Sequence, residues 1–300
     1  MDKGSPTFSI IIPTYNRPAM LAECLKSLTE LDYPPRVFEV IVVDDGGPVS
    51  LKPVVESFEK EMQIILLRRE NGGPAAARNS GIAVARGKYL AFTDDDCKPD
   101  PGWLKELEKH LVIESCLMVG GRTINVLLDN PYSCTSQLIV DIVYAHYNAN
   151  PSMARFFASN NIAVPADAFR GIRGFNPLFR TSEDRDACDR WLANGYRMVY
   201  APGAVIYHAH KLSLESFWKQ HAAYGRGALR FNRAHSSRSR GDSTLSSDFY
   251  IELPGRLKKA LSGVPAKRIP ALLFLVATWF VANTFGFVSE TVKYMRSKDA

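Results

Sequence analysis

Residues 71–104, NGGPAAARNSGIAVARGKYLAFTDDDCKPDPGWL, hold a chain break, a helical run, a strand-like run and an acidic turn in close succession. The glycines and proline at 72–74 interrupt the chain, and the alanine-rich run 75–85 that follows them is a strong helix former. Residues 89–93 form a short β-rich run that ends in the three aspartates 94–96. The stretch therefore predicts a helix followed by a strand whose carboxyl end is acidic.

Three further β-rich runs, at 8–12, 37–43 and 63–67, precede this stretch and alternate with segments of helical length and pattern. Alternating strands and helices indicate an α/β fold with a doubly wound, mainly parallel, Rossmann-like sheet flanked by helices. Because the crossovers of such a sheet are right-handed, the carboxyl ends of its strands gather along one edge. Open α/β sheets bind their ligands at that edge.

The residues expected at the ligand-binding edge are chemically distinctive. The first strand runs into Pro13, Thr14, Tyr15 and Asn16, the second into Asp44 and Asp45, and the fourth into Asp94, Asp95 and Asp96. Five carboxylates are thus expected to converge there. The sequence contains neither a Gly-x-Gly-x-x-Gly turn after a strand nor a Gly-Lys-Ser/Thr loop, so dinucleotide-binding and P-loop proteins are excluded.

The acidic turn has two interpretations on its own chemistry. Adjacent carboxylates repel one another and lose hydration when a ligand covers them, so a cation is their natural partner. All-oxygen ligands point to Mg²⁺ or Mn²⁺, which would bridge the two phosphates of a nucleoside diphosphate. A solvated acidic loop explains residues 94–96 equally well, and Asp44 and Asp45 on the neighbouring strand favour the metal site. Arg78, on the helix that follows the Gly72–Gly73 loop, would either reach this edge or lie exposed on the helix surface.

The composition, with 46% hydrophobic and 23% charged residues among 300, is that of a folded globular protein. The formal net charge is +6, with the basic excess mostly beyond residue 210, and such a region suits lipid headgroups or nucleic acid. The five cysteines form no Cys-x-x-Cys pair, which argues against a zinc site and a disulfide framework. The first ten residues lack a signal-peptide pattern, so we expect a cytoplasmic catalytic body.

The pattern changes in the second half of the chain. Residues 156–210 contain short strands and turns with one clear helix, Asp184–Asn194, which Gly195 ends. We expect a catalytic domain at 1–211, with a nucleotide-binding half at about 1–122 and an acceptor half at about 123–211, and then a basic extension at 212–300.

The extension contains two notable segments. Residues 236–247, rich in Ser, Arg, Gly and Asp, are typical of a mobile loop. Residues 269–289 carry no charged side chain and are long enough to cross about 30 Å of hydrocarbon as a helix. Pro270 and Asn283 make this a weak span, so a helix packed on the domain or lying in the interface plane stays open. We expect membrane association, peripheral or anchored, at the inner face of the cell membrane.

Five segments together resemble glycosyltransferase family 2, with its GT-A fold: IIIPTYNRPAMLAECLKSL, VIVVDDGG, residues 71–104, SNNIAVPADAFRGIRGFNP and TSEDRDACDRWLANGYRMVYAPGAVIYH. The match covers about residues 8–210 and keeps the order of the motifs, which makes it specific. The resemblance implies a metal-dependent, inverting enzyme that moves a sugar from a nucleotide-sugar donor. The habit of the family favours UDP, with GDP and dTDP open.

The resemblance also implies a donor site. Thr14 and Tyr15 would lie against the nucleotide base, and Asp45 would accept a hydrogen bond from it. The residues that we expect to contact the donor are Pro13, Thr14, Tyr15, Asn16, Asp45, Arg78, Asp94 and Asp95.

The metal site implied by the resemblance centres on the acidic turn. The last carboxylate, Asp96, would hold Mn²⁺ or Mg²⁺, while Asp94 or Asp95 would address ribose and sugar. The triple aspartate leaves open which of these two also contacts the metal, and Asp94 is the one we assign. A late histidine often completes the site in GT-A enzymes, and we expect His208 rather than His210 in that role. A structural histidine in the core explains His208 equally well.

The resemblance implies a catalytic base in the Glu183–Asp184 pair at the start of a helix. An acceptor hydroxyl needs such a base within hydrogen-bond reach to attack the anomeric carbon, and we expect it to be Asp184. Glu183 and Asp184 would also favour the helix dipole, with Ser182 or Thr181 as a capping residue. Asn160 and Asn161 resemble the acceptor-side segment of the family.

Processive members of the family carry a Gln-x-x-Arg-Trp motif and several membrane spans, whereas residues 218–226 read WKQHAAYGR and at most one span is expected. This implies transfer of single sugars to a glycan or lipid-linked acceptor, with no nucleic-acid partner. A catalytically silent nucleotide-sugar or glycan-binding module of the same fold is the alternative. A nucleotidyltransferase is a third, but it would need a Gly-rich triphosphate loop that the sequence lacks after its first strand.

Overall fold

The computed structural model describes residues 5–238 and 247–298, which divide into two compact units. The first unit comprises residues up to 124 together with 150–209, and the second comprises 125–149 together with 210 onward. Most of the expected mobile loop at 236–247 lies outside the described residues.

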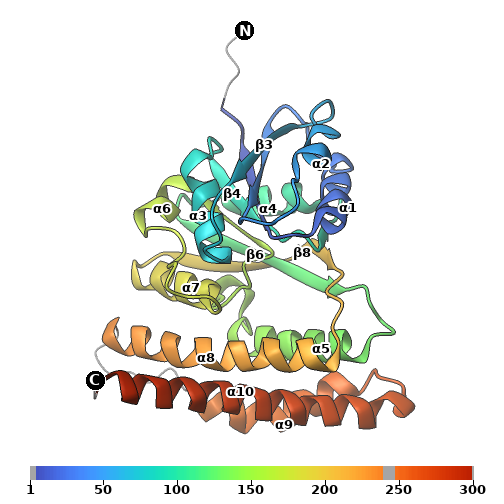
Figure 1. Ribbon diagram of the computed structural model, residues 1–300, viewed down its shortest axis with the longest axis vertical. Coiled ribbons are helices and arrows are strands. Elements are labelled where there is room, and N and C mark those ends of the chain that lie inside the picture. The colour runs from blue at the N-terminus through green and yellow to red at the C-terminus, as the bar shows by residue number, and fades with distance from the viewer. Residues whose placement is uncertain (1–4, 239–246, 299–300) are drawn as a thin grey trace. The chain divides into compact units, whose positions relative to one another are not determined.

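One eight-stranded sheet, in the order β3-β2-β1-β4-β7-β6-β8-β5, organises the first unit (Figure 1). Its strands are β1 (Phe8–Thr14), β2 (Phe38–Asp44), β3 (Gln63–Arg68), β4 (Tyr89–Phe92), β5 (Cys97–Pro99), β6 (Leu117–Asn125), β7 (Ile162–Pro165) and β8 (Arg197–His208). The first four are the strands predicted from the β-rich runs, and β1 to β4 pair in parallel. The register sets Thr14 of β1 beside Asp44 of β2, so their carboxyl ends share one edge.

Three further strand pairs are antiparallel, which makes the whole sheet mixed. Strand β7 runs antiparallel to both β4 and β6, and β5 runs antiparallel to β8. Parallel neighbours need a long crossover, usually a helix, and the short strands and turns after residue 156 offer little room for one. The antiparallel half returns the end of β8 to the acidic turn, because Cys97 of β5 pairs with His208.

Helices cover both faces of this sheet. They are α1 (Pro18–Thr29), α2 (Lys52–Glu56), α3 (Pro74–Val84), α4 (Trp103–Leu111), α6 (Ala166–Gly171) and α7 (Glu183–Ala193), with a 3-10 turn at Pro151–Met153. Alternate residues of β1 point to opposite faces. Ile10 and Ile12 join the core under α1, α2 and α4. On the other face, a Cβ on Gly81 would lie 2.6 Å from Ile11, so glycine lets α3 approach β1 closely.

The second unit is helical. It contains α5 (Pro131–Tyr147), α8 (Leu214–Arg238), α9 (Ser247–Leu261) and α10 (Ile269–Lys298), with a 3-10 turn at Ala266–Arg268. Ile139 of α5 packs with Phe217 of α8 and Leu275 of α10, so α5 groups with the C-terminal helices. Our sequence-based boundaries placed that segment in the catalytic domain. The local sequence pattern could not show its packing partners, because they lie 70 or more residues further along the chain.

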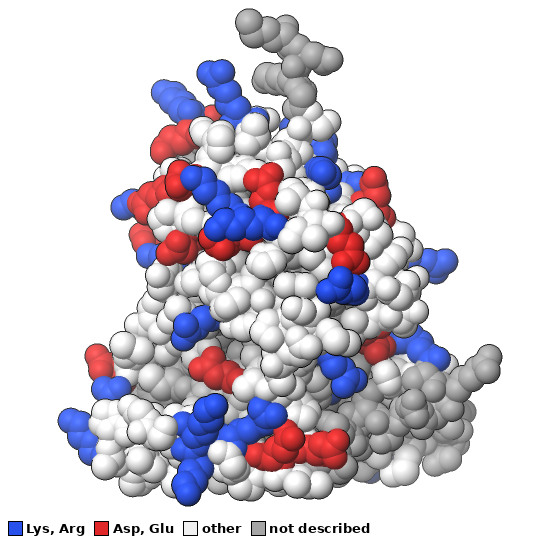
Figure 2. Space-filling view, turned by 180° about the vertical axis from the view of Figure 1, so that it is seen from behind, with Lys and Arg blue, Asp and Glu red and all other residues white. Residues whose placement is uncertain are grey.

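Helices α8 and α10 cross at glycines. A Cβ on Gly225 would lie 2.0 Å from the carbonyl oxygen of Asn283, and one on Gly286 would lie 1.9 Å from that of Ala222. Helix α10 is long and apolar enough to cross a membrane, and only 22% of its apolar window is buried. Figure 2 shows one face of the molecule, on which basic and acidic side chains alternate around broad uncharged areas.

Candidate active site

The three aspartates of the acidic turn contact three different partners. The turn lies between β4 and β5, and each of Asp94, Asp95 and Asp96 has a partner of its own from a different element. Asp94 accepts a 2.6 Å hydrogen bond from Arg78, Asp95 one of 2.7 Å from Thr14, and Asp96 lies 3.2 Å from His208. The turn is therefore held by β1, α3 and β8 together, rather than being a solvated acidic loop.

Asp95 is the structural member of the turn. Its side chain is 5% exposed, and both its oxygens are bound by residues at the end of β1, Thr14 and Arg17. Burial raises the pKa of Asp95 to about 6, although the hydrogen bond from Thr14 and the charge of Arg17 lower it. Arg17 also donates to Asp96 over 3.3 Å. Thr14, which we expect to lie against a base, is 4% exposed and donates to Asp95.

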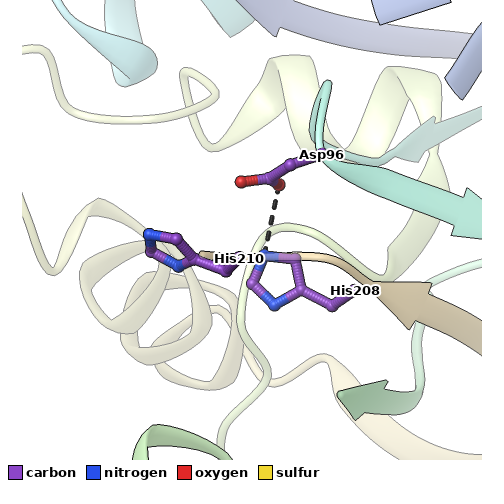
Figure 3. Close-up of side chains that lie close together, drawn as sticks. All are labelled: Asp96, His208 and His210. Carbon is purple, nitrogen blue, oxygen red and sulfur yellow. Dashed lines mark hydrogen bonds and ion pairs between the residues drawn. The ribbon is translucent and has the colours of Figure 1, made fainter. Parts of the chain in front are cut away.

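Asp96 and His208 are brought together by the pairing of β5 with β8 (Figure 3). The backbone N–H of Ala209 donates to the carbonyl of Asp96 over 3.0 Å, which fixes the two segments. Burial works against the charged ring, but the hydrogen bond and charge of Asp96 outweigh it and raise the pKa of His208. One ligand atom each from Asp96, His208 and His210, the next histidine along the chain, lie within 4.8 Å of one another.

The residues at this position fit a divalent cation. A carboxylate and an imidazole are common ligands of first-row divalent metals, and carboxylates are also the ligands that Mg²⁺ and Mn²⁺ take in proteins. Three buried polar atoms at or beside the turn have no protein partner among the described residues: Thr93 Oγ1, Arg78 Nε and Asn160 Oδ1. Buried polar groups are almost always hydrogen-bonded, so this cluster indicates a place for a ligand or for water.

Arg78 connects the acidic turn to the base helix. Its guanidinium is 3% exposed and donates both to Asp94 and, over 3.0 Å, to Glu183 at the start of α7. The side chain also lies over the ring of Phe175, 5.5 Å from the ring centre. Of the two positions that the sequence allowed for Arg78, the exposed one is wrong. The residue reaches the edge as a buried link between two carboxylates.

The pair Glu183 and Asp184 begins α7 as expected. Burial, with the charge of Asp184, raises the pKa of Glu183 to about 7, although Arg78 lowers it. Burial also raises the pKa of Asp184, against the backbone N–H of Arg185, which donates to Asp184 over 2.7 Å. A carboxyl with a pKa near neutral pH, as Glu183 has, is suited to acid and base chemistry. The capping role expected of Ser182 is wrong, because this residue has φ 68° and makes no side-chain capping bond.

The end of β2 shapes a loop. Asp45 is 4% exposed and accepts hydrogen bonds from the backbone N–H groups of Gly72 and Gly73 and from Arg69. Gly73 has φ 88°, a conformation that side chains disfavour. The carboxylate expected to meet the base thus also anchors the glycine loop in front of α3. Tyr15, by contrast, is 51% exposed and free to contact a ligand.

Four other expected residues differ in their exposure and in the hydrogen-bonding groups that they have left for a ligand. Pro13 is part of β1, and Asn16 is exposed with φ 55°. Asn161 is fully buried. Its Oδ1 accepts a hydrogen bond from Trp103, and its Nδ2 donates to the carbonyls of Arg122 and Ala204. Asn160 keeps its Oδ1 unpaired, and its Nδ2 faces the thiol of Cys97. Of these two asparagines, only Asn160 has capacity left for an acceptor.

Comparison with known proteins bears on this geometry. The sequence profile of glycosyl transferase family 2 matches residues 9–173, which is more than half of the chain. The chain belongs to glycosyl transferase family 2. A second profile, glycosyl transferase family group 2, matches residues 117–289 and so extends into the helical unit. The family and the GT-A fold expected from the five motifs are confirmed.

Relatives of this family 2 protein include a pre-mycofactocin glycosyltransferase of Mycobacterium tuberculosis. It is 30% identical over 227 residues, which cover 73% of this chain and 46% of that protein. The chain thus spans about half the length of this curated relative.

Two solved structures share the fold. The mannosyltransferase PcManGT from Pyrobaculum calidifontis, in complex with GDP-Man and Mn²⁺, has a TM-score of 0.68 at 19% identity and covers 99% of this chain and 89% of its own. Residues 1–349 of Staphylococcus aureus TarS, in complex with UDP-GlcNAc, give a TM-score of 0.55 at 17% identity and cover 96% and 92%. At these identities the likeness establishes the fold of this family 2 chain and nothing finer.

Sequence reasoning missed two residues of the site. Arg17 binds two of the three aspartates, and Arg69 binds Asp45. Both follow directly on strand ends that the sequence had located, so a search for cations next to the acidic positions would have found them. The link from Arg78 to Glu183 had no such signal, because 105 residues separate the two.

Proposed function

We propose that the protein transfers one sugar from a nucleotide-sugar donor to an acceptor hydroxyl with inversion at the anomeric carbon. The observation that carries this proposal is the division of labour in the acidic turn, where Asp96 faces His208 while Asp94 is linked through Arg78 to Glu183. The metal position that we propose at Asp96 and the carboxyl pair at the start of α7 would then lie on two sides of one turn. Such an arrangement suits displacement at a carbon held between a diphosphate and a base.

The chemistry balances as a single displacement. The acceptor oxygen forms its bond to the anomeric carbon as the bond from that carbon to the diphosphate oxygen breaks, and the diphosphate leaves with the bonding electron pair. Asp184, in its ionised form, takes the proton of the acceptor hydroxyl. Glu183, whose pKa burial and Asp184 raise to about 7, is the second member of the pair and shares the proton equilibrium with it.

A divalent cation, Mn²⁺ or Mg²⁺, would be held by Asp96 and His208. When bound, such a cation neutralises charge on the diphosphate of the leaving group. Asp94, the other expected ligand, is engaged by Arg78, which favours a positioning role for it. Arg17, which bridges Asp95 and Asp96 and is 47% exposed, adds a positive charge at the same place. The Mn²⁺ named with the mannosyltransferase structure supports a metal in this position.

The donor is a nucleoside diphosphate sugar, and we keep UDP as the first nucleotide to test. The structural neighbours support both UDP-linked and GDP-linked sugars, since one is named with UDP-GlcNAc and the other with GDP-Man. The exposed Tyr15 and the loop anchored by Asp45 would receive the base. Asn160, with its unpaired Oδ1, would face the acceptor.

We place the acceptor at a membrane surface, as a lipid-linked or surface glycan precursor, with the catalytic unit on the cytoplasmic side. Helix α10 supports this proposal, because Phe274, Phe280 and Phe285 are each about half exposed or more on an uncharged stretch. Exposed aromatic and aliphatic side chains beside the basic Lys267 and Arg268 suit an anionic lipid interface.

A panel of nucleotide sugars with Mn²⁺ or Mg²⁺, followed by nucleotide release, tests the function. Asp184→Asn is the matched variant. We expect turnover to fall by about 100-fold or more, the contribution typical of a general base, with donor binding nearly unchanged. Equal losses of turnover and donor binding would remove Asp184 from its assigned role. Donor binding without release of nucleotide by the unmodified protein, under any condition of the panel, would favour the silent binding module.

A further inference from the structure

One buried cation of the first unit joins two carboxylates from separate elements. Arg78 lies on α3 with a side chain that is 3% exposed. Its Nη2 donates to Asp94 over 2.6 Å, and its Nη1 donates to Glu183 over 3.0 Å. The two carboxylates belong to the turn after β4 and to the first residue of α7, so one guanidinium joins two separate elements.

The fork of arginine explains why this residue type is used. A guanidinium is planar and offers donors on two nitrogens at fixed directions, whereas a lysine ammonium is a single point of charge. Buried charges of this kind are costly unless both partners are present, since removing one partner leaves the other uncompensated. The ring of Phe175 covers one face of the group, and Asn79 bonds both the N–H and the carbonyl of Phe175. The guanidinium is therefore fixed from several sides.

We propose that Arg78 is a positioning residue that couples the donor turn to the catalytic base. It holds Asp94 and Glu183 at a fixed separation, and its charge lowers the pKa values of Glu183 and Asp184 against the burial that raises them. This inference rests on the proposed function and differs from the donor-binding role that the sequence suggested. A residue this buried acts through the carboxylates it holds, and Asp94 is its link to the donor.

The charged groups around Glu183 and Asp184 set the pKa values that a pH profile of kcat would report. Glu183 and Asp184 face Arg78 from α3 and Arg185 from α7, and Asp94 from the acidic turn adds a further negative charge near Glu183. Loss of Arg78 leaves Arg185 as the positive charge that acts on Asp184. An opposite charge at this range shifts a pKa by about one to three units. Removal of Arg78 therefore moves the rising limb of activity against pH upward by about one unit or more.

The test compares Arg78→Lys and Arg78→Ala with a matched control, Arg86→Lys. Arg86 pairs with the fully buried Glu39, and Ser9 also donates to Glu39 at the amino end of the sheet, away from the acidic turn. For each variant, kcat, donor KM, the pH profile of kcat and the thermal midpoint are measured on the full chain.

For Arg78→Lys we expect kcat to fall about 100-fold, as misplacement of a catalytic group by about 1 Å does, with donor KM changed less than kcat. For Arg78→Ala we also expect the upward shift of the rising limb. Arg86→Lys lowers only the thermal midpoint. Two results together would overturn the coupling. In Arg78→Lys the fall in kcat would be matched by an equal rise in donor KM, and in Arg78→Ala the rising limb of the pH profile would stay where it is. Absence of transfer by the unmodified protein instead refutes the proposed function itself.

A double-mutant cycle serves if the Arg78 variants do not fold. Asp94→Asn and Glu183→Gln keep an oxygen for Arg78 while removing one charge each, and the proposed link between the two residues runs through Arg78. Coupling predicts that their effects on kcat are non-additive by about threefold or more. Additive effects within that limit overturn the proposal.

Discussion

Glu183 gives a prediction about stability that runs against first expectation. A carboxylate beside an arginine is usually held ionised, with a lowered pKa. Here burial and Asp184 outweigh Arg78 and raise the pKa of Glu183 from 4.5 to about 7. At about 1.4 kcal/mol per pKa unit, ionising Glu183 in the folded protein is harder by about 3 kcal/mol than in the unfolded chain. The side chain is 9% exposed, so solvent screens little of this cost.

The sign follows from linkage. Between about pH 4.5 and pH 7 the folded protein holds the proton of Glu183 while the unfolded chain has released it. The stability that this proton supplies is complete below pH 4.5 and is lost as pH rises through about 7. Glu183→Gln has no such proton to lose. The free energy of unfolding of Glu183→Gln, relative to that of the unmodified protein, should therefore rise by about 3 kcal/mol between a pH below 4.5 and pH 8.

Urea unfolding followed by tryptophan fluorescence at a series of pH values measures this difference. Trp103 and Trp191, both fully buried in the first unit, report on the part of the chain that contains Glu183. Asp167→Asn is a suitable control, because Asp167 lies fully exposed at the surface. A flat difference across the window refutes the reasoning. A variant that loses relative stability as pH rises would mean that Arg78, rather than burial, sets the pKa of Glu183.

The remaining predictions concern the metal, the membrane and the helical unit. Asp96→Ala should weaken donor binding in the presence of Mn²⁺ by about tenfold or more and leave metal-free binding unchanged, as measured by titration; unaltered metal dependence would exclude Asp96 as a ligand. The full chain should sediment with anionic vesicles, and Phe274→Ser with Phe280→Ser should reduce the bound fraction severalfold; equal binding would exclude α10 as the contact. Gly286→Val should lower the thermal midpoint of the helical unit, because its Cβ would lie 1.9 Å from a backbone oxygen; an unchanged midpoint would contradict the close crossing of α8 and α10.

Local pattern was sufficient to predict the parallel half of the sheet and the acidic edge. Each of β1 to β4 is a short apolar run, and each carboxyl end is marked by polar residues next to it in sequence. The antiparallel half was beyond such reasoning, since the pairing of Cys97 with His208 joins residues that no periodicity connects. The sequence motifs did place His208 among the candidates, but its contact with Asp96 depends on that pairing.

The candidate site was predictable in content and less so in geometry. Residue types alone could not decide whether Asp94 or Asp95 contacts the metal, because three adjacent aspartates are chemically identical. The structure separates them through partners from three elements: Arg78 for Asp94, Thr14 for Asp95 and His208 for Asp96. Burial was also invisible in the sequence, and it is burial that changes Arg78 from a surface cation into an internal link.

The distinct surroundings of the three aspartates make the acidic turn a convenient set of spectroscopic reporters. Selective ¹³C labelling of aspartate carboxyls would give one signal that senses α3, one that senses β1 and one that senses β8. A nucleotide that enters the site without reaching the base helix would move the third signal alone. A ligand that draws both halves together would move the first as well, so binding and assembly could be followed separately in one experiment.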